Sequence, residues 1–341
     1  MWCLVLTMKE KKNKISEKKP VALILAGYNQ VNYKVRKKKN KEIMEAYGHE
    51  IYIGQNKFLH DLNGKPVMHY VLDAVYNAKK NGKPLYEKIY IYNDIKSLKE
   101  HIDVTQYNNL ELRQMTASVG GHWNDFYFND IDYGQRVDVF FGDTPRIDSE
   151  DVQWIHEEYS KVLGVKKDHR GVPINMMYAI VNVEDMEDNW LEDRMKLIKR
   201  GKHKGLYKYF VYFKEFTARV GNSGAIIKDK GMDELIEKEA VNFIYNLRKA
   251  LTPNILSKIF YYIWKNKHIE FLKDVKAKCM KYTQFIDVNL DILQKIYKFD
   301  LSKYAGAVLH INRHGGRWEN DIDSPSDMEI FREKFYNHKK K

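Results

Sequence analysis

The chain has 341 residues, of which 44% are hydrophobic, enough for one large domain or two small ones with a buried core. Its formal net charge of +12 favours acidic partners such as nucleotides, phosphates, nucleic acid or an anionic membrane surface, although a lysine-rich solvated surface gives the same balance. Its two cysteines, Cys3 and Cys279, exclude a disulfide framework and a cysteine metal cluster.

Residues 1–19 form a basic N-terminal extension. Its short apolar run precedes its lysines, whereas a secretory signal has the reverse order and a longer apolar core. No stretch of the sequence approaches the roughly 18–20 apolar residues of a membrane span. We therefore expect a cytoplasmic protein without a transmembrane segment.

Short apolar runs alternate with helix-period segments through the first half of the chain. Val67, Val71 and Val75 recur every four residues, which predicts an amphipathic helix. Ser149 is the expected N-cap of a second helix. The predicted helices are 65–80 and 149–163, and the predicted strands are 21–26, 88–93, 110–115, 137–142, 176–183 and 207–213.

This alternation predicts an α/β fold, a three-layer α/β/α sandwich with a mostly parallel sheet. The strands are continuously apolar, which is typical of strands buried on both faces. Ligands of such sheets bind beyond the carboxyl ends of the strands. That rule indicates Gly27 and the pair Gly142–Asp143 as candidate site residues.

Residues 232–304 differ from the rest, because they consist of consecutive predicted helices broken at Thr252-Pro253. We expect a helical insertion in an α/β domain that spans 20–231 and is completed by a strand and helix in 305–341. The aromatic run at 259–264 would suit a core, a homodimer contact or a membrane interface.

The segment after Gly27 is strongly basic, with six basic residues among the eight at 34–41. The end of a strand frees backbone N–H groups, and a glycine turn lets phosphates approach them. A cationic loop could then close over a triphosphate. The same basic run could bind nucleic acid or simply be solvated, and the next candidate, Lys57, could be a surface lysine.

Acidic residues follow two of the predicted elements. Asp143 comes directly after a buried strand, where hard oxygen ligands hold Mg²⁺ together with substrate phosphates, although such an aspartate can also cap a helix. Asp321 and Asp323 alternate around Ile322, so in an extended segment both carboxylates face one side. Two such carboxylates repel each other unless a cation lies between them. Asp327, by contrast, is explained as part of a helix start.

Four motifs occur in a characteristic order: strand-Leu-Ala-Gly, a lysine before an apolar step and Gly-Lys-Pro, strand-Gly-Asp-Thr-Pro, and Asp-Ile-Asp-Ser-Pro-x-Asp. This order resembles the MobA-like nucleotidyltransferase superfamily, which includes sugar-phosphate nucleotidylyltransferases and molybdenum-cofactor guanylyltransferases. The resemblance covers about 20–230 and 305–335. It implies a GT-A-like fold of the nucleotide-diphospho-sugar transferase type.

The resemblance also assigns roles to particular residues. Lys57 and Asp143 would be catalytic, and Mg²⁺ would be held by Asp143 with Asp321 or Asp323. The nucleotide would contact Leu25, Ala26, Gly27, Tyr28, Arg36 and Lys57, and the acceptor would contact Lys214, Arg219 and Asn222. Tyr28 stands where the family has a second glycine, and the loop from Gly27 to Lys57 is longer than usual. The ring of Tyr28 would stack near the base or ribose, or the long basic loop would hold the triphosphate instead.

The implied activity is transfer of an NMP group from an NTP to a phosphorylated small molecule, such as a sugar or polyol phosphate, with Mg²⁺ and release of pyrophosphate. One alternative is a GT-A-type glycosyltransferase that consumes a nucleotide-sugar. Another is a non-catalytic nucleotide- or anion-binding module. Nucleic acid is not expected, since the acidic motifs would repel phosphates without a metal.

For Lys214, Arg219 and Asn222 the alternative is a surface hairpin with a Gly-Asn turn. His310 and His314 have metal-ligand spacing, but nearby glycines argue against the helix a zinc site would need.

Overall fold

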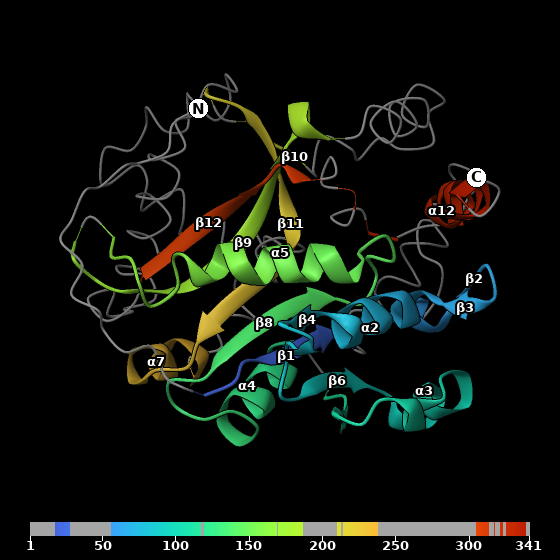
Figure 1. The fold of residues 1–341 in the computed structure, drawn as a ribbon, viewed down its shortest axis with the longest axis horizontal. Helices are drawn as coiled ribbons and strands as arrows, with labels where there is room; N and C mark the ends of the chain where they lie inside the picture. The colour runs from blue at the N-terminus through green and yellow to red at the C-terminus, as the bar shows by residue number, and fades with distance from the viewer. Residues whose placement is uncertain are drawn as a thin grey trace, which may run out of the picture.

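The structure is a computed structural model (Figure 1). It describes residues 18–27, 56–116, 119–168, 170–186, 210–212, 214–237, 305–313, 317, 321–322 and 325–338. Tyr28, Arg36, Asp323 and His314 therefore lie outside the described residues. So do the basic run at 34–41, the aromatic run at 259–264 and the predicted insertion beyond residue 237.

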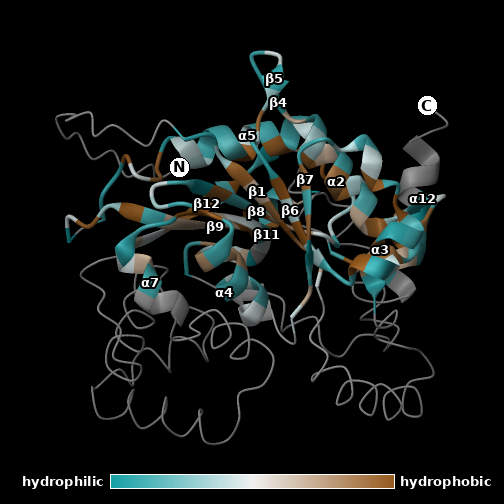
Figure 2. Cartoon of the chain, turned by 90° about the horizontal axis from the view of Figure 1, so that it is seen from below, coloured by the Kyte–Doolittle hydropathy of each residue, from teal (hydrophilic) through white to brown (hydrophobic). Residues whose placement is uncertain are grey.

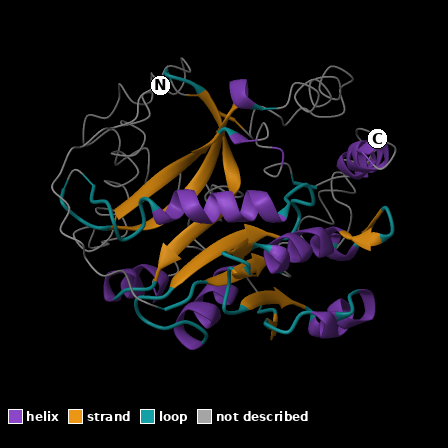
Figure 3. Cartoon of the chain, viewed as in Figure 1, coloured by secondary structure: helices purple, strands orange, loops and turns teal. Residues whose placement is uncertain are grey.

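One eight-stranded sheet forms the centre of the described structure, in the order β12-β9-β11-β8-β1-β6-β7, with β10 beside β11 (Figures 1 and 3). Among these eight strands only β11 runs against the others, because its pairings with β8, β9 and β10 are antiparallel and the remaining pairings are parallel. The strands are β1 (Val21–Leu25), β6 (Ile89–Asn93), β7 (Leu110–Gln114), β8 (Arg136–Phe141), β9 (Ile174–Asn182), β10 (Phe210–Tyr212), β11 (Thr217–Ile227) and β12 (Ala305–Ile311).

Helices cover both faces of the sheet, as Figure 2 shows with α2 and α5 on one side and α4 and α7 on the other. The three-layer α/β/α arrangement with a mostly parallel sheet is thus confirmed. The helices are α2 (Val67–Asn77), α3 (Ile95–His101), α4 (Val119–Asn129), α5 (Ser149–Ser160), α7 (Lys230–Glu237) and α12 (Pro325–His338), with short 3₁₀ turns η1 (Lys57–Leu59), η2 (Val104–Gln106) and η3 (Val183–Asp185).

Alternation along β1 divides the core between the two helical layers. Ala22, Ile24 and Ala26 pack in the cluster under α2 and α5, whereas Leu23 and Leu25 pack in the cluster under α4. This two-sided burial is what a continuously apolar strand predicts. The predicted helix face of Val67, Val71 and Val75 is likewise buried. No helix in the described part of the chain combines the length and the apolar character that crossing a bilayer requires.

Two small hairpins extend from the main body, β2–β3 (Asp61–Leu62 and Lys65–Pro66) and β4–β5 (Lys79–Lys80 and Lys83–Pro84). Asn63 and Gly64 link β2 to β3 with φ of 55° and 86°. Positive φ at both central residues is typical of the type I′ turn that an Asn-Gly pair favours. The Asn63-Gly64 pair in the sequence thus predicts the tight turn that the structure has.

Two local predictions were wrong. The N-cap of α5 is Asp148 rather than Ser149, because the Asp148 carboxylate accepts the Asp151 N–H while the Asp151 side chain accepts the Asp148 N–H. The alternative of a Gly-Asn hairpin turn is also wrong, because Gly221 and Asn222 lie inside β11, in the middle of the sheet.

Candidate active site

The carboxyl ends of β1 and β8 lie side by side. Leu25 is in register with Phe141, and the Gly142 N–H donates to the Leu25 carbonyl at 3.0 Å. A Cβ at Gly142 would lie 3.0 Å from the Ala26 Cβ and 3.2 Å from the Phe58 ring, so a larger residue would push the two strand ends apart. The chain then places the buried side chain of Asp143 beyond this edge.

Lys57 and Asp143, predicted to act together, form an ion pair. Lys57 opens η1, whose next two residues, Phe58 and Leu59, are buried and fix its backbone to the core. The Lys57 ammonium also lies 5.6 Å from the centre of the Phe58 ring. A cation and a carboxylate are thereby held together at the end of β8, where a charged ligand would be expected.

Asn93, which the sequence analysis did not single out, organises the same edge. It is buried at the end of β6, donates from Nδ2 to the Ala26 carbonyl at 2.9 Å, and accepts the Asp94 N–H at 2.7 Å. These backbone partners fix the orientation of its amide, so Asn56 must donate to its Oδ1, at 3.1 Å. Asn93 thus ties the ends of β1 and β6 to the residue before Lys57. The only sequence signal was a polar residue closing an apolar strand.

Gly27 has a packing role that the sequence did not reveal. A Cβ there would lie 2.6 Å from Cε1 and 2.7 Å from Nε2 of His122, in the first turns of α4. His122 is buried, and desolvation lowers its pKa to about 4 although Asp125 opposes the shift, so the ring is neutral at pH 7. Within the described part of the chain its Nε2 has no hydrogen-bond partner. The imidazole therefore requires a glycine at position 27, independently of any phosphate.

The C-terminal segment reaches the same edge. The Ile322 N–H donates to the Asp143 carbonyl at 3.0 Å, and the Ile322 side chain is buried with Met328 and Phe331 of α12. The predicted alternation around Ile322 places the neighbouring Asp321 on the other side, where it forms an ion pair with Arg219. The structure thus brings Asp321 next to Asp143.

Arg219 reaches this position because β11 is longer than its neighbour. β11 pairs with β8 only from Ser223 to Ile227, so its first half extends past the carboxyl end of β8 and pairs with β9 and β10 instead, Arg219 opposite Val181 and Phe210. The pairing with β9 shifts register between Val220 and Gly224, an irregularity of the kind that redirects side chains near functional sites.

The other two predicted acceptor residues, Asn222 and Lys214, differ in environment. Asn222 is buried inside the irregular part of β11, next to the equally buried Ser223. Lys214 is exposed, in the connection between β10 and β11. The structure therefore links Lys57, Asp143, Asp321 and Arg219 through two ion pairs and the hydrogen bond from Ile322 to Asp143, whereas Lys214 lies on the surface.

Two other charged clusters serve the scaffold. Within β8, the fully buried Asp138 accepts from Arg136 Nε at 2.7 Å and from the Tyr86 hydroxyl at 2.9 Å, and lies 2.7 Å from His156 Nδ1. Burial alone would raise the pKa of Asp138, but Arg136 and His156 lower it to about 2.

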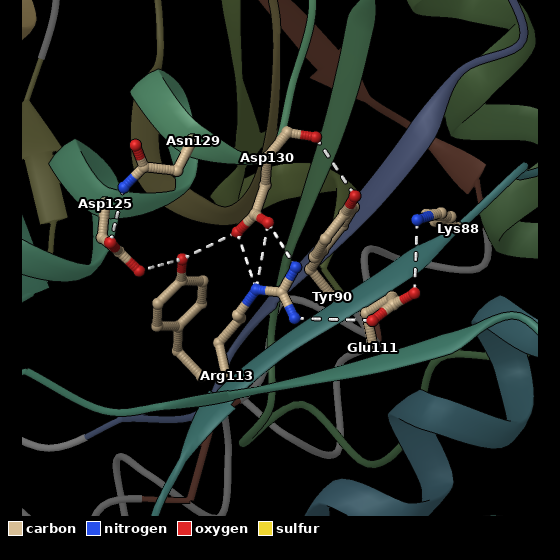
Figure 4. Close-up of polar contacts among 8 residues, drawn as sticks. Lys88, Tyr90, Glu111, Arg113, Asp125, Asn129 and Asp130 are labelled. Atoms are coloured by element: carbon tan, nitrogen blue, oxygen red, sulfur yellow. Dashed lines mark hydrogen bonds and ion pairs between the residues drawn. The ribbon is translucent and has the colours of Figure 1, made fainter.

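The second scaffold cluster lies where α4 meets β6 and the edge strand β7 (Figure 4). Arg113 Nε donates to both carboxylate oxygens of Asp130 at 3.0 Å. The Tyr90 hydroxyl donates to the Asp130 carbonyl at 3.1 Å, and the Tyr92 hydroxyl lies 2.7 Å from Asp125. These contacts give hydrogen-bond partners to the polar groups at the C-terminal end of α4. They also place charged side chains on the edge strand β7, which disfavours its pairing with another chain.

No protein family and no curated protein matches the sequence. Among solved structures, a hypothetical transferase from Thermus thermophilus matches at 14% identity, covering 91% of this chain and 100% of that chain, with a TM-score of 0.53. The chain shares the fold of this transferase. This likeness shows the fold alone, and it agrees with the three-layer α/β/α sandwich predicted from the sequence.

Two further solved structures match with lower TM-scores. They are 4-diphosphocytidyl-2C-methyl-D-erythritol synthase from Anaerococcus prevotii (9% identity, 94% of this chain and 99% of that one, TM-score 0.44) and CMP:2-keto-3-deoxy-manno-octonic acid synthetase complexed with CTP (9% identity, 93% and 98%, TM-score 0.41).

Proposed function

We propose that this protein is a nucleotidyltransferase, which moves an NMP group from a nucleoside triphosphate to a phosphorylated small molecule such as a sugar or polyol phosphate and releases pyrophosphate. The observation that carries the proposal is the meeting of two ion pairs, Lys57–Asp143 and Arg219–Asp321, where the Ile322 N–H binds the Asp143 carbonyl. Two cations and two carboxylates at the carboxyl ends of strands suit a ligand that carries phosphates.

The residues present fit a magnesium ion. Asp143 and Asp321 supply carboxylate oxygens, the ligands Mg²⁺ prefers, and phosphates and water would complete its coordination. Within the described residues no group of three or more His, Cys, Asp or Glu side chains could hold a metal, so the substrate would contribute several ligands. When bound, the ion would neutralise charge on the phosphates.

The side chains of the protein would contribute mainly by positioning the two substrates. In the proposed reaction an oxygen of the acceptor phosphate forms a bond to the α-phosphorus of the nucleotide, and the bond from that phosphorus to the bridging oxygen breaks. Pyrophosphate leaves with the electron pair. Lys57 would hold the triphosphate and Arg219 the acceptor phosphate, so that attacking and leaving oxygens stand in line. The acceptor phosphate is largely ionised near pH 7, so no general base is required.

Tyr28 and Arg36 would contact the nucleotide with Leu25, Ala26 and Gly27, and Asp323 would be the second candidate for the metal beside Asp321. Asn222 and Lys214 would contribute to acceptor binding. These assignments follow from the motif order in the sequence. Tyr28, Arg36 and Asp323 can be tested by alanine substitution and measurement of KM for each substrate.

The test begins with thermal shift of the wild-type chain against ATP, CTP, GTP and UTP with Mg²⁺, since a ligand that binds only the folded state raises its apparent stability. The preferred triphosphate is then incubated with a panel of sugar and polyol phosphates while pyrophosphate is measured. Preference for one triphosphate together with pyrophosphate release would support the proposal. Release of a nucleoside diphosphate from a nucleotide-sugar would indicate a glycosyltransferase instead, and binding without turnover would indicate a non-catalytic module.

A further inference from the structure

The described residues around Asp321 contact the segment that follows Asp143. We call its described residues, Arg313, Arg317, Asp321 and Ile322, the C-terminal strap. The strap runs antiparallel to residues 143–151, because its last residue contacts the first of that segment and its first contacts the last. The contacts are Ile322 to Asp143, Arg317 to Asp148 and Asp151, and Arg313 to Asp151 and Glu150.

Arg317 binds the pair of acids that begin α5. Asp148 is the N-cap and Asp151 closes the capping box, and Arg317 Nη2 contacts Asp148 and lies 3.1 Å from Asp151 Oδ2. The Asp151 side chain is fully buried, so its carboxylate depends on cationic partners. The contact of Arg313 with Glu150 is more exposed, with 78% of the Glu150 side chain accessible.

Asp321 lies between two attachment points. Four residues before it, Arg317 holds the strap to α5, and directly after it Ile322 is held by its apolar contacts with α12 and its hydrogen bond to Asp143. The attachment at α5 is polar and charge-assisted, because one guanidinium nitrogen, Nη2 of Arg317, contacts both carboxylates.

We propose that Arg317 is a positioning residue, which anchors the C-terminal strap on the capping box of α5 and thereby holds Asp321, with its partner Arg219, beside Asp143. Its effect on turnover rests on the proposed nucleotidyl transfer, whereas its effect on the strap does not. A residue that supports the groups around a reaction centre controls activity without touching substrate, with losses of about 10- to 100-fold on substitution.

The experiment compares Arg317→Ala, Arg317→Lys and Asp148→Asn with the wild type. Asp148→Asn is the sharpest variant, because asparagine caps a helix about as well as aspartate while removing the charge that Arg317 binds. Arg332→Ala is the matched control, since Arg332 is an exposed arginine of α12 that donates to the Asp61 carbonyl at 3.2 Å, away from α5.

The primary readout is hydrogen exchange at the Ile322 amide, which binds the Asp143 carbonyl. In Arg317→Ala and Asp148→Asn we expect exchange to accelerate about tenfold or more, as for loss of a charge-assisted hydrogen bond, while β1 and α2 exchange as in the wild type. The exchange rate in Arg317→Lys should lie between those of the wild type and Arg317→Ala. Unchanged exchange at Ile322, or equal acceleration in every element, would overturn the proposal.

The second readout is kcat for pyrophosphate release, expected to fall about 10- to 100-fold in Arg317→Ala and to be unchanged in Arg332→Ala. If the wild-type protein shows no nucleotidyl transfer, the proposed function is contradicted, whereas the hydrogen-exchange test of the strap still applies. A locally loosened strap with unchanged kcat would overturn the positioning role alone. If Arg317→Ala fails to fold, hydrogen exchange at Ile322 and kcat are measured in Arg317→Lys and Asp148→Asn, and these two variants then test the proposal.

Discussion

Strand β8 presents two buried aspartates in contrasting environments. Asp138 lies within the strand and is contacted by Arg136, His156 and Tyr86, all from the scaffold. Asp143 lies just past the strand end, where its ion-pair partner is Lys57 at the start of a short 3₁₀ turn. The first carboxylate is enclosed by packed elements on one face of the sheet. The second stands at the edge where parallel sheets bind ligands.

The difference shows that burial and charge alone do not identify a site. A carboxylate whose partners all belong to the core stabilises one conformation, and removing a member leaves an uncompensated charge. For a carboxylate at a strand end, with a lysine from a separate segment and a backbone contact to the C-terminal strap, we propose that a ligand replaces one of its partners. Four substitutions or conditions test this contrast.

The largest expected effect is on stability. Asp138→Ala should lower the free energy of unfolding by about 3–5 kcal/mol, because Arg136 is left as a buried charge without its carboxylate. Urea denaturation followed by circular dichroism measures the change. A variant as stable as the wild type would show that the Asp138 cluster is not structural.

Asp143→Asn should reduce activity and leave stability nearly unchanged. We expect metal-dependent pyrophosphate release to be abolished, while the free energy of unfolding changes by less than about 1 kcal/mol because the amide retains the shape of the carboxylate. Activity assays and denaturation of the same preparation provide the comparison. Full activity in this variant would remove Asp143 from the metal site.

Gly27→Ala tests whether the end of β1 behaves as scaffold. The added methyl group would meet the His122 ring, so we expect a loss of about 1–3 kcal/mol through overpacking. His122→Ala in the same chain should recover part of that loss, because it removes the atoms that clash. Simple addition of the two single effects in a double-mutant cycle would contradict the packing role.

The smallest expected effect is on the free energy of unfolding at low pH. The pKa of Asp138 is about 2 in the folded protein, below its ordinary value of 3.8, so the contribution of this group to stability is present above about pH 4. It is lost as the pH falls toward 2, because protonation then removes the charge that Arg136 and His156 bind. The midpoint of urea denaturation between pH 5 and pH 2.5 should fall less in an Asp138→Asn variant than in the wild type.

The scaffold was largely predictable because its signals are local. Continuous apolar runs predicted β1 and β8, the spacing of three valines predicted α2, and Asn63-Gly64 predicted a tight turn. The errors were local as well. Asp148 and Ser149 are both good caps, and only the reach of the Asp148 carboxylate to the Asp151 N–H distinguishes them. Gly221-Asn222 looks like a turn, but the residues on either side of it pair with neighbouring strands and make it an irregular part of β11.

The candidate site was predictable only in part, because its contacts join distant segments. Motif order brought Lys57, Asp143 and Asp321 to attention. It did not indicate that Asp321 pairs with Arg219 or that Asn93 ties Ala26 to Asn56. His122 also escaped notice, because no periodicity marks a ring that occupies the space above a glycine. Such relations depend on the sheet order, which places β11 and the strap next to β8.

The antiparallel course of the C-terminal strap has a consequence for biosynthesis. Arg317 and Asp148, which the strap joins, are 169 residues apart in the sequence. At a translation rate of about 5–20 residues per second, the ribosome needs on the order of 10 to 30 seconds to advance from one to the other. A nascent chain that already contains β1 and β8 therefore lacks its last carboxylate during that interval. Premature termination between Asp143 and Asp321 would release a polypeptide that contains the Lys57–Asp143 ion pair but lacks Asp321 and Ile322.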